Sequence, residues 1–294
     1  MSILHTMECC HWDETFSTEM KSHSVKIIEN GAILHFPRLS FVLTSDEIQL
    51  LSPNIADQKA KNISYNHLTG LLGGVKLIND QDSLKAMLQR YMQHATQLIK
   101  NLFPDYADHL IMGRTSFRPT EISGRVTSYR KDDTRLHVDA FPATPNQGRR
   151  ILRIFTNIHP EGKCRVWRVG DSFPNVVKQF LPQVRKPWAG KSKLMKLLRL
   201  TKSYRTEYDH IMLKIHDSMK ADLRYQAIAP QHEIKFSPGS SWIVQTDQIS
   251  HAAMSGQHVL EQTFYLPVEC MVNPELSPLK TLEKIVGREL TLFS

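Results

Sequence analysis

The chain has 294 residues, of which 41% are hydrophobic and 22% charged, as in soluble globular proteins with an ample core. No run of 18 apolar residues occurs, so we expect no membrane-spanning helix, and the N-terminal residues lack the pattern of a secretory signal. The net charge of +8 favours anionic partners, namely nucleic acid, phospholipid surfaces or anionic sugars, without choosing among them.

Cysteine usage points to a reducing compartment. The four cysteines, Cys9, Cys10, Cys164 and Cys270, form neither a CxxC pair nor a disulfide framework. The neighbouring Cys9 and Cys10 precede His11, but no further metal ligands lie nearby, so we interpret them as a reduced pair without a catalytic role. We therefore expect a cytoplasmic protein, with peripheral contact to the inner face of the inner membrane as an open alternative.

Residues 1–110 are predicted to form a mixed α/β region that packs on the core. Within residues 24–41, two short runs with strand character flank Glu29-Asn30-Gly31, a turn signal. Residues 81–103 predict an amphipathic helix, with Asp82 or Ser83 as the N-cap. Its apolar residues recur at helical spacing: Leu84, Met87, Leu88, Met92, Ala95, Leu98 and Ile99.

From residue 111 the pattern changes to short strands. RVTSYR, RRILRIFTNI and CRVWRVG are followed by strand-like segments between 231 and 268, with Pro and Gly at the intervening turns. Residues 173–225 instead have helical spacing, as in EYDHIMLKIHDSMK. We predict an α+β fold, mainly β: a jelly-roll (double-stranded β-helix) core over 111–270 with a basic helical insertion at 173–225, N-terminal helices, and a C-terminal helix over 271–294.

The segment TRLHVDAFP, residues 134–142, carries the clearest chemical signal. Residues i and i+2 of an extended segment share a face, so His137 and Asp139 are expected to point together. His251 is expected at the end of a late apolar strand and before another strand, and a jelly roll brings such a histidine to the HxD turn, which is itself expected at the end of a strand. Two histidines and one carboxylate leave three metal positions open, which suits non-haem iron(II) and oxygen chemistry. A satisfied surface pair is the alternative for HxD alone.

Two long stretches resemble the Kdo 3-hydroxylase family. They are RLHVDAFPATPNQGRRILRIFTNIHPEGKCRVWRVGDSF and FSPGSSWIVQTDQISHAAMSGQHVLEQTFYL, and GAILHFPRLSF and KNISYN are also similar. The resemblance implies a double-stranded β-helix enzyme that uses Fe(II), 2-oxoglutarate and O2 and releases succinate and CO2. It further implies hydroxylation at C3 of 3-deoxy-octulosonic acid (Kdo) in the lipopolysaccharide inner core, with lipid-linked Kdo (Kdo-lipid A) as the substrate.

Because the resemblance implies 2-oxoglutarate, we expect a buried cation, preferably an arginine, that binds its distal carboxylate. Many dioxygenases place an arginine about ten residues after the last histidine, but here that position is Glu261. Arg153, on the strand after HxD, is the first candidate and Arg118 the second. The remaining predicted contacts are Trp167 as a stacking wall, Tyr129 and Thr263 as cosubstrate hydrogen-bond partners, and Arg149 and Arg150 as substrate contacts.

The helical insertion is strongly basic over residues 185–205, where cations alternate with leucines. One interpretation is a solvated helix face whose apolar stripe enters the core, and the other is contact with an anionic membrane surface or lipid phosphates. The cations are Arg185, Lys186, Lys191, Lys193, Lys196, Arg199, Lys202 and Arg205.

Three other functions remain open alternatives. The metal could organise an anionic sugar site in a non-catalytic jelly-roll module. The positive charge could serve nucleic-acid binding, although no recognition motif specifies it. A hydrolytic zinc enzyme could use the same three ligands, but an arginine on the strand after HxD fits an anionic cosubstrate better.

Overall fold

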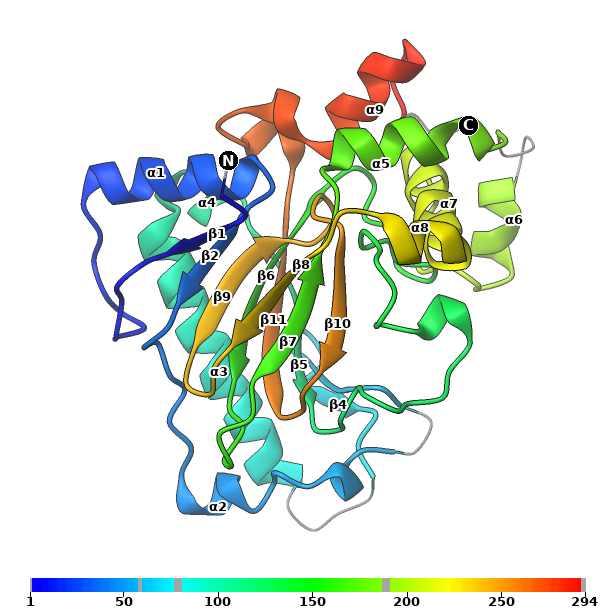
Figure 1. The fold of residues 1–294 in the computed structure, drawn as a ribbon. Coiled ribbons are helices and arrows are strands. Elements are labelled where there is room, and N and C mark those ends of the chain that lie inside the picture. Colours follow the sequence, from blue (N-terminus) through cyan, green and yellow to red (C-terminus); the bar gives the residue numbers. More distant parts are fainter. Residues whose placement is uncertain (1, 58–59, 77–80, 187–190, 292–294) are drawn as a thin grey trace.

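Two β-sheets face each other in the computed structural model, which describes residues 2–57, 60–76, 81–186 and 191–291 (Figure 1). In the described part of the chain the larger sheet has eight strands in the order β1-β2-β9-β6-β11-β5-β3-β4, and the smaller has three in the order β10-β7-β8. The larger sheet contains β1 (Leu4–Thr6), β2 (Ile33–Phe36), β3 (Ile63–Asn66), β4 (Leu71–Gly73), β5 (Ile111–Arg118), β6 (Arg150–Asn157), β9 (Ser241–Gln245) and β11 (Val259–Leu266). The smaller contains β7 (Arg165–Val169), β8 (His232–Phe236) and β10 (His251–Ser255). This arrangement confirms the predicted jelly roll.

Helices cover the outer face of the larger sheet and one end of the molecule. Figure 1 shows α3 behind the larger sheet, and α5 to α8 grouped beside the ends of β7 and β8. The helices are α1 (Thr18–Glu29), α2 (Ser45–Ile48), α3 (Gln81–Leu102), α4 (Pro104–Ala107), α5 (Phe173–Phe180), α6 (Lys191–Leu197), α7 (Glu207–Ala221), α8 (Leu223–Ile228) and α9 (Pro278–Val286). No helix in the described ranges has the length and apolar character required to cross a bilayer.

The core has two layers because successive residues of a strand point to opposite faces. Between the sheets, Trp242 stacks on Phe236 with ring centroids 3.9 Å apart, and Phe155 stacks on Trp242. On the outer face of the larger sheet, α3 buries its apolar stripe, and the Tyr91 hydroxyl lies 3.1 Å from Thr156 Oγ1. Burial of each large apolar side chain stabilises the fold by about 1.5–3 kcal/mol, so these two layers hold the sheets in fixed positions relative to each other.

The predicted helices are found, but two predicted strands are wrong. α3 confirms the helix over 81–103, and α5 to α8 confirm the helical insertion. A C-terminal helix is also present, but α9 covers only Pro278–Val286 of the predicted 271–294. Residues 24–28 belong to α1, which begins after the N-cap Ser17 and buries Val25 and Ile28 on one face. RVTSYR, residues 125–130, forms no strand; it is a loop that ends in the 3-10 helix η2 (Tyr129–Lys131). A β-like composition gives no strand where no neighbouring strand is available for pairing.

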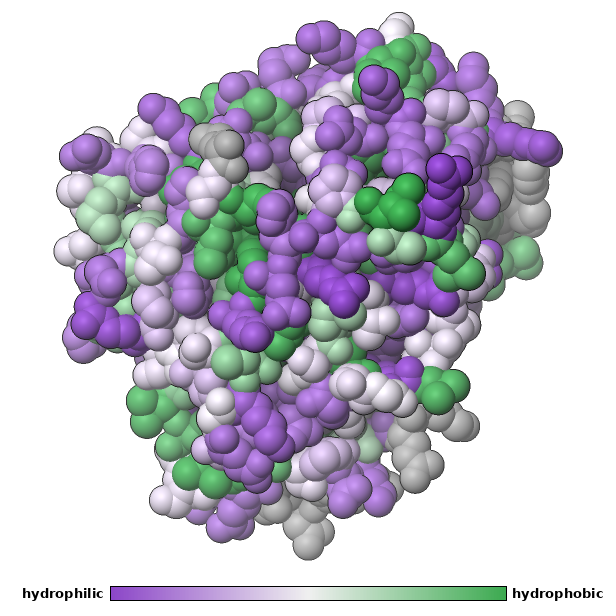
Figure 2. Space-filling view, in the orientation of Figure 1, coloured by the Kyte–Doolittle hydropathy of each residue, from purple (hydrophilic) through white to green (hydrophobic). Residues whose placement is uncertain are grey.

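The helical insertion lies between β7 and β8 in the sequence, yet these two strands pair as antiparallel neighbours. The smaller sheet is therefore continuous. The N-terminal region adds β1 and β2 to one edge of the larger sheet and β3 and β4 to the other. Hydrophilic and hydrophobic side chains are interspersed over the face drawn in Figure 2. This face therefore does not mark a site for an anionic partner by a single large patch.

Candidate metal and cosubstrate site

His137, Asp139 and His251 come together as the sequence predicts. One ligand atom from each lies within 4.8 Å of the others, and His137 Nε2 is 3.6 Å from Asp139 Oδ1. Both imidazoles are buried. The three groups therefore form a compact set with the donor atoms of a two-histidine, one-carboxylate metal site.

The backbone fixes this convergence. His137 and His251 exchange two backbone hydrogen bonds, of 3.0 and 2.9 Å, so the HxD segment extends the smaller sheet beside β10. The Asp139 backbone N–H donates to Thr246 O at 2.8 Å. The predicted alternation holds, with one correction: residues 137–139 make a single bridge and no full strand, and His251 begins β10 instead of ending a strand.

In both imidazoles, Nδ1 contacts a backbone carbonyl oxygen and Nε2 is left for a metal. His137 Nδ1 lies 2.8 Å from Arg135 O, and His251 Nδ1 lies 2.9 Å from Ile249 O. A carbonyl oxygen only accepts, so Nδ1 carries the proton in both rings and Nε2 keeps its lone pair. This is how metal-binding histidines are usually oriented by their surroundings.

The local electrostatics favour the protonation states that a metal requires. Burial, together with the positive charge of Lys220, lowers the pKa of His137 to about 3, and burial also lowers the pKa of His251. Burial alone would raise the pKa of Asp139, but Arg153 and the contact with His137 hold it well below its ordinary value. Neutral imidazoles and an ionised carboxylate are therefore present together at neutral pH.

Trp167, on β7, forms one wall of the site. Its ring stacks on His251 with centroids 5.1 Å apart and an interplanar angle of 22°. Edge contacts with Phe155 and Trp242 hold it from behind. The predicted stacking wall thus lies directly against a metal ligand.

Two arginines converge behind the metal ligands. Arg153 lies on the inner face of β6; one amino nitrogen is 3.2 Å from Asp139 Oδ2 and the other 3.2 Å from Glu261 Oε1. Arg118 donates to Glu261 Oε2 through Nε at 2.9 Å. Thr263, opposite Arg153 on β11, donates to Glu261 Oε1 at 3.1 Å. Glu261 is therefore the carboxylate that joins both arginines.

Unsatisfied polar atoms mark this space as a binding site. Among the buried atoms of the described residues that have no hydrogen-bond partner are Arg153 Nε and Trp167 Nε1, and Asp139 Oδ2 has only its ion pair with Arg153. Buried polar groups are normally satisfied, so such a cluster needs an explanation. A metal at the three ligands and an anion beside the arginine would supply the missing partners, so the residues fit both groups.

The other predicted residues lie elsewhere. Arg150 is fully buried and bound to Asp247 at 2.7 Å and Gln248 at 2.6 Å, so its predicted substrate contact is wrong. Arg149 is half-buried and donates to Gln147 at 3.2 Å. Tyr129, on η2, has the Arg130 guanidinium 4.9 Å from its ring centre and no described contact with Arg153.

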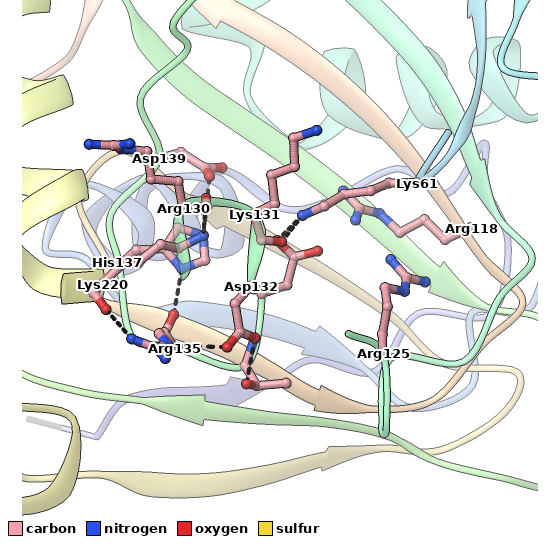
Figure 3. Close-up of polar contacts among 12 residues, drawn as sticks. Lys61, Arg118, Arg125, Arg130, Lys131, Asp132, Arg135, His137, Asp139 and Lys220 are labelled. Carbon is pink, nitrogen blue, oxygen red and sulfur yellow. Dashed lines mark hydrogen bonds and ion pairs between the residues drawn. The ribbon is translucent and has the colours of Figure 1, made fainter. Parts of the chain in front are cut away.

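Sequence analysis missed several charged groups around the ligands. Figure 3 shows Arg130, Lys131 and Arg135 on the segment that leads to His137, with Lys220 beside it. Lys61 and Arg118 lie on the other side. Strand alternation could have placed Glu261 and Tyr265 on the inner face of β11 with Thr263. Nothing in the sequence shows that Lys220, unlike the exposed Lys214 of the same helix, is buried without a carboxylate partner.

Comparison with known proteins agrees with this geometry. Residues 11–289 match the family model described as 3-deoxy-D-manno-oct-2-ulosonic acid (Kdo) hydroxylase. The comparison with curated proteins found no match.

Similar solved structures include that of the Kdo hydroxylase KdoO, a non-haem Fe(II) α-ketoglutarate-dependent dioxygenase, with α-ketoglutarate and Fe(III). It is 44% identical, covers 98% of this chain and 97% of its own, and has a TM-score of 0.94. Its cobalt(II) complex is 44% identical, with coverages of 100% and 99% and a TM-score of 0.96. The apo structure is 44% identical over 100% of both chains, with a TM-score of 0.95. This chain belongs to the Kdo hydroxylase family.

Proposed function

We propose that this protein is an Fe(II)/2-oxoglutarate-dependent dioxygenase that hydroxylates C3 of a lipid-linked Kdo sugar. The observation that carries the proposal is the continuous set formed by the three metal ligands and Arg153, which contacts the ligand Asp139 and Glu261 together. Family membership agrees with it. A non-catalytic sugar-binding module, nucleic-acid binding and zinc hydrolysis are not favoured.

His137, Asp139 and His251 would hold the iron through two Nε2 atoms and one carboxylate oxygen. When bound, iron and 2-oxoglutarate supply oxidation by O2: one oxygen atom enters the substrate C–H bond, the other enters succinate, and CO2 leaves. The chain keeps its ligands deprotonated by burial and by Arg153. Trp167 stacks on His251 and excludes water from that side.

Arg153 and Arg118 are the proposed partners of the distal cosubstrate carboxylate. Arg153 is 8% exposed and its Nε has no partner, so it retains a donor for an incoming anion. Burial disfavours its charged form, yet Asp139 and Glu261 raise its pKa above the ordinary value, so it remains cationic. Thr263 adds a hydroxyl on the same inner face. A charge-assisted hydrogen bond in such a dry site is about twice as strong as a neutral one.

Succinate release tests this function. The protein is loaded anaerobically with Fe(II) and given 2-oxoglutarate and air, with and without Kdo-lipid A. We expect release that rises with the lipid, together with a gain of one oxygen atom on the sugar. H137A should abolish both, whereas H232A, at an exposed histidine on β8, should not. Full activity of H137A would overturn the assignment, and release without sugar oxidation would exclude Kdo-lipid A as the substrate.

The basic insertion supports a peripheral contact with an anionic membrane surface. Leu197, Leu198 and Leu200 do not enter the core: they are 79%, 57% and 58% exposed. Lys196, Arg199 and Lys202 are exposed beside them. Residues 187–190 of the insertion lie outside the described residues. Each cation near an anionic bilayer contributes about 1 kcal/mol, so three cations with inserted leucines suffice for reversible binding.

Vesicle flotation tests the membrane contact. The variant K196E/R199E/K202E should lose binding to vesicles that contain phosphatidylglycerol. K26E/K100E/K284E changes the net charge equally at exposed lysines of α1, α3 and α9 and should retain binding. Equal binding of the two variants would contradict a role for the insertion.

A further inference from the structure

Lys220, on α7, is a buried lysine without a counter-ion. Its residue is 2% exposed, and no carboxylate of the described residues lies within 4.0 Å of its ammonium group. Four neighbouring cations are paired: Lys61 with Asp133, Arg118 with Glu261, Arg130 with Asp217 and Arg135 with Asp132. Lys220 therefore differs from these four cations, and unlike the exposed Lys131 it is buried.

Helix geometry directs Lys220 towards the metal ligands. His216 and Lys220 are four residues apart, so they share one face of α7, and long helical side chains lean back towards the preceding turn. The His216 ring meets the His137 ring edge-on, with centroids 5.3 Å apart. Lys220 thus lies one turn beyond a residue that touches the metal ligand His137.

Two hydrogen bonds fix Lys220 against the segment that precedes His137 (Figure 3). Lys220 Nζ donates to Arg130 O at 3.2 Å, and Arg135 Nη1 donates to Lys220 O at 2.7 Å. Arg135 O in turn accepts from His137 Nδ1. The position of this lysine is therefore coupled to the orientation of the imidazole.

An ammonium has three N–H donors, and only one acceptor is described for Lys220. Burial lowers its pKa, whereas Asp133 and Asp139 act in the opposite direction. A buried charge is costly unless it is paired, so the site is unbalanced until an anion binds. An anionic group beside the metal ligands would restore the balance.

The substrate class supplies that group, and this step rests on the proposed function. In a 3-deoxy-oct-2-ulosonic acid the carboxylate is C1 and the reacting methylene is C3. Two C–C bonds separate these carbons, which places them about 2.5 Å apart. When C3 faces the metal, the carboxylate must lie beside it, and Arg153 and Arg118 are assigned to the cosubstrate.

Arg165 is also buried without an ion pair, but it lies on the side of the site that holds Arg118. It donates to Gly256 O at 2.8 Å, at the turn between β10 and β11. Burial and the positive charge of Arg118 lower the pKa of Arg165 to about 9. Arg165 is thus grouped with an arginine assigned to the cosubstrate, whereas Lys220 acts on His137 from the side of α7.

We propose that Lys220 binds the C1 carboxylate of the Kdo substrate and thereby orients C3 towards the metal site. The lysine then sets the preference for an acidic sugar and fixes which carbon is presented. Its contribution is a charge-assisted hydrogen bond in a water-poor site.

The test compares K220M with wild type on two substrates: Kdo-lipid A, and the same lipid with the Kdo carboxylate converted to a primary amide. In wild type, the amide should lower kcat/KM by roughly ten- to a hundredfold. K220M should show a similar loss on the acid but little further loss on the amide. K220R should recover part of the activity on the acid, and K214M, at an exposed lysine of α7, should match wild type.

A structural role for Lys220 would give a different result: K220M would lose activity equally on both substrates. Equal turnover of acid and amide by wild type would also overturn the proposal, and this comparison needs no variant. Calorimetry under nitrogen should show that K220M still binds Fe(II) and 2-oxoglutarate, so that its loss of activity lies at the sugar. Failure of the proposed function itself is distinct, because wild type would then release no succinate with Kdo-lipid A.

Discussion

Replacement of Arg153 by methionine should weaken 2-oxoglutarate binding more than any other single arginine change. Methionine keeps most of the side-chain volume but removes the charge that lies 3.2 Å from both Asp139 and Glu261. A hydrogen bond to a charged group is worth about 1.5–3 kcal/mol, and each 1.4 kcal/mol is a tenfold change in affinity. The expected rise in KM for 2-oxoglutarate is therefore about 10- to 150-fold.

Arg118 provides the internal comparison. Its side chain is 18% exposed against 10% for Arg153, and its described partner is Glu261 alone. R118M should therefore raise KM less than R153M. R168M, at an exposed arginine on β7, should leave KM unchanged.

The assay is the initial rate of succinate release at saturating Kdo-lipid A over a range of 2-oxoglutarate concentrations. Removal of Arg153 also leaves Asp139 and Glu261 without their shared cation, so thermal melting of each variant must be recorded. R153M/E261Q removes one of these charges and should recover stability without recovering cosubstrate affinity. A larger KM increase in R118M than in R153M would refute the assignment of Arg153 as the main partner.

Three further predictions concern stability and reactivity. R150M should lower the free energy of unfolding in urea by about 3–5 kcal/mol, because it leaves the carboxylate of Asp247 buried and unpaired; a loss below 1 kcal/mol would contradict this. In metal-free protein, burial and Lys220 lower the pKa of His137 from 6.5 to about 3, so between these values the unfolded state binds more protons than the folded state. The free energy of unfolding should therefore decrease as the pH falls from 6.5 towards 3, and it should decrease less steeply in H137Q. If urea titrations give the same pH dependence for H137Q and wild type, His137 is not the cause. Burial raises the pKa of Cys9 to about 12, whereas Cys10 is exposed, so iodoacetamide at pH 8 should label Cys10 first; equal labelling by mass spectrometry would contradict it.

Residue spacing in the sequence predicted the helix that covers the larger sheet and the side chains that share a face in the HxD segment. The period of apolar residues predicted α3, because a helix that covers a sheet must bury one stripe. The HxD spacing predicted that His137 and Asp139 share a face, because extended backbone alternates by two. The position of His251 between two strands, together with the family resemblance, predicted the third ligand.

Other features were decided by tertiary pairing. RVTSYR has strand composition but no neighbouring strand to pair with, and Ser24–Ile28 becomes helical because Ser17 caps α1 and its apolar face packs on the core. The roles of Arg150 and Lys220 depend on whether a carboxylate from a distant segment reaches them. Asp247 reaches Arg150, which is therefore structural, and no described carboxylate pairs with Lys220.

The sequence by itself thus predicted the metal-ligand set and the fold class, because each follows from spacing along one or two strands, and it left Arg153 and Arg118 as two candidates for the cosubstrate carboxylate. Only the tertiary structure decided which buried cations are neutralised. That depends on contacts between residues far apart in the chain, such as Arg150 with Asp247 and Arg118 with Glu261. Ion pairs between distant segments follow no repeating pattern in the sequence. The unpaired Lys220 near His137 is therefore recognised only from the packing of α7 against the HxD segment.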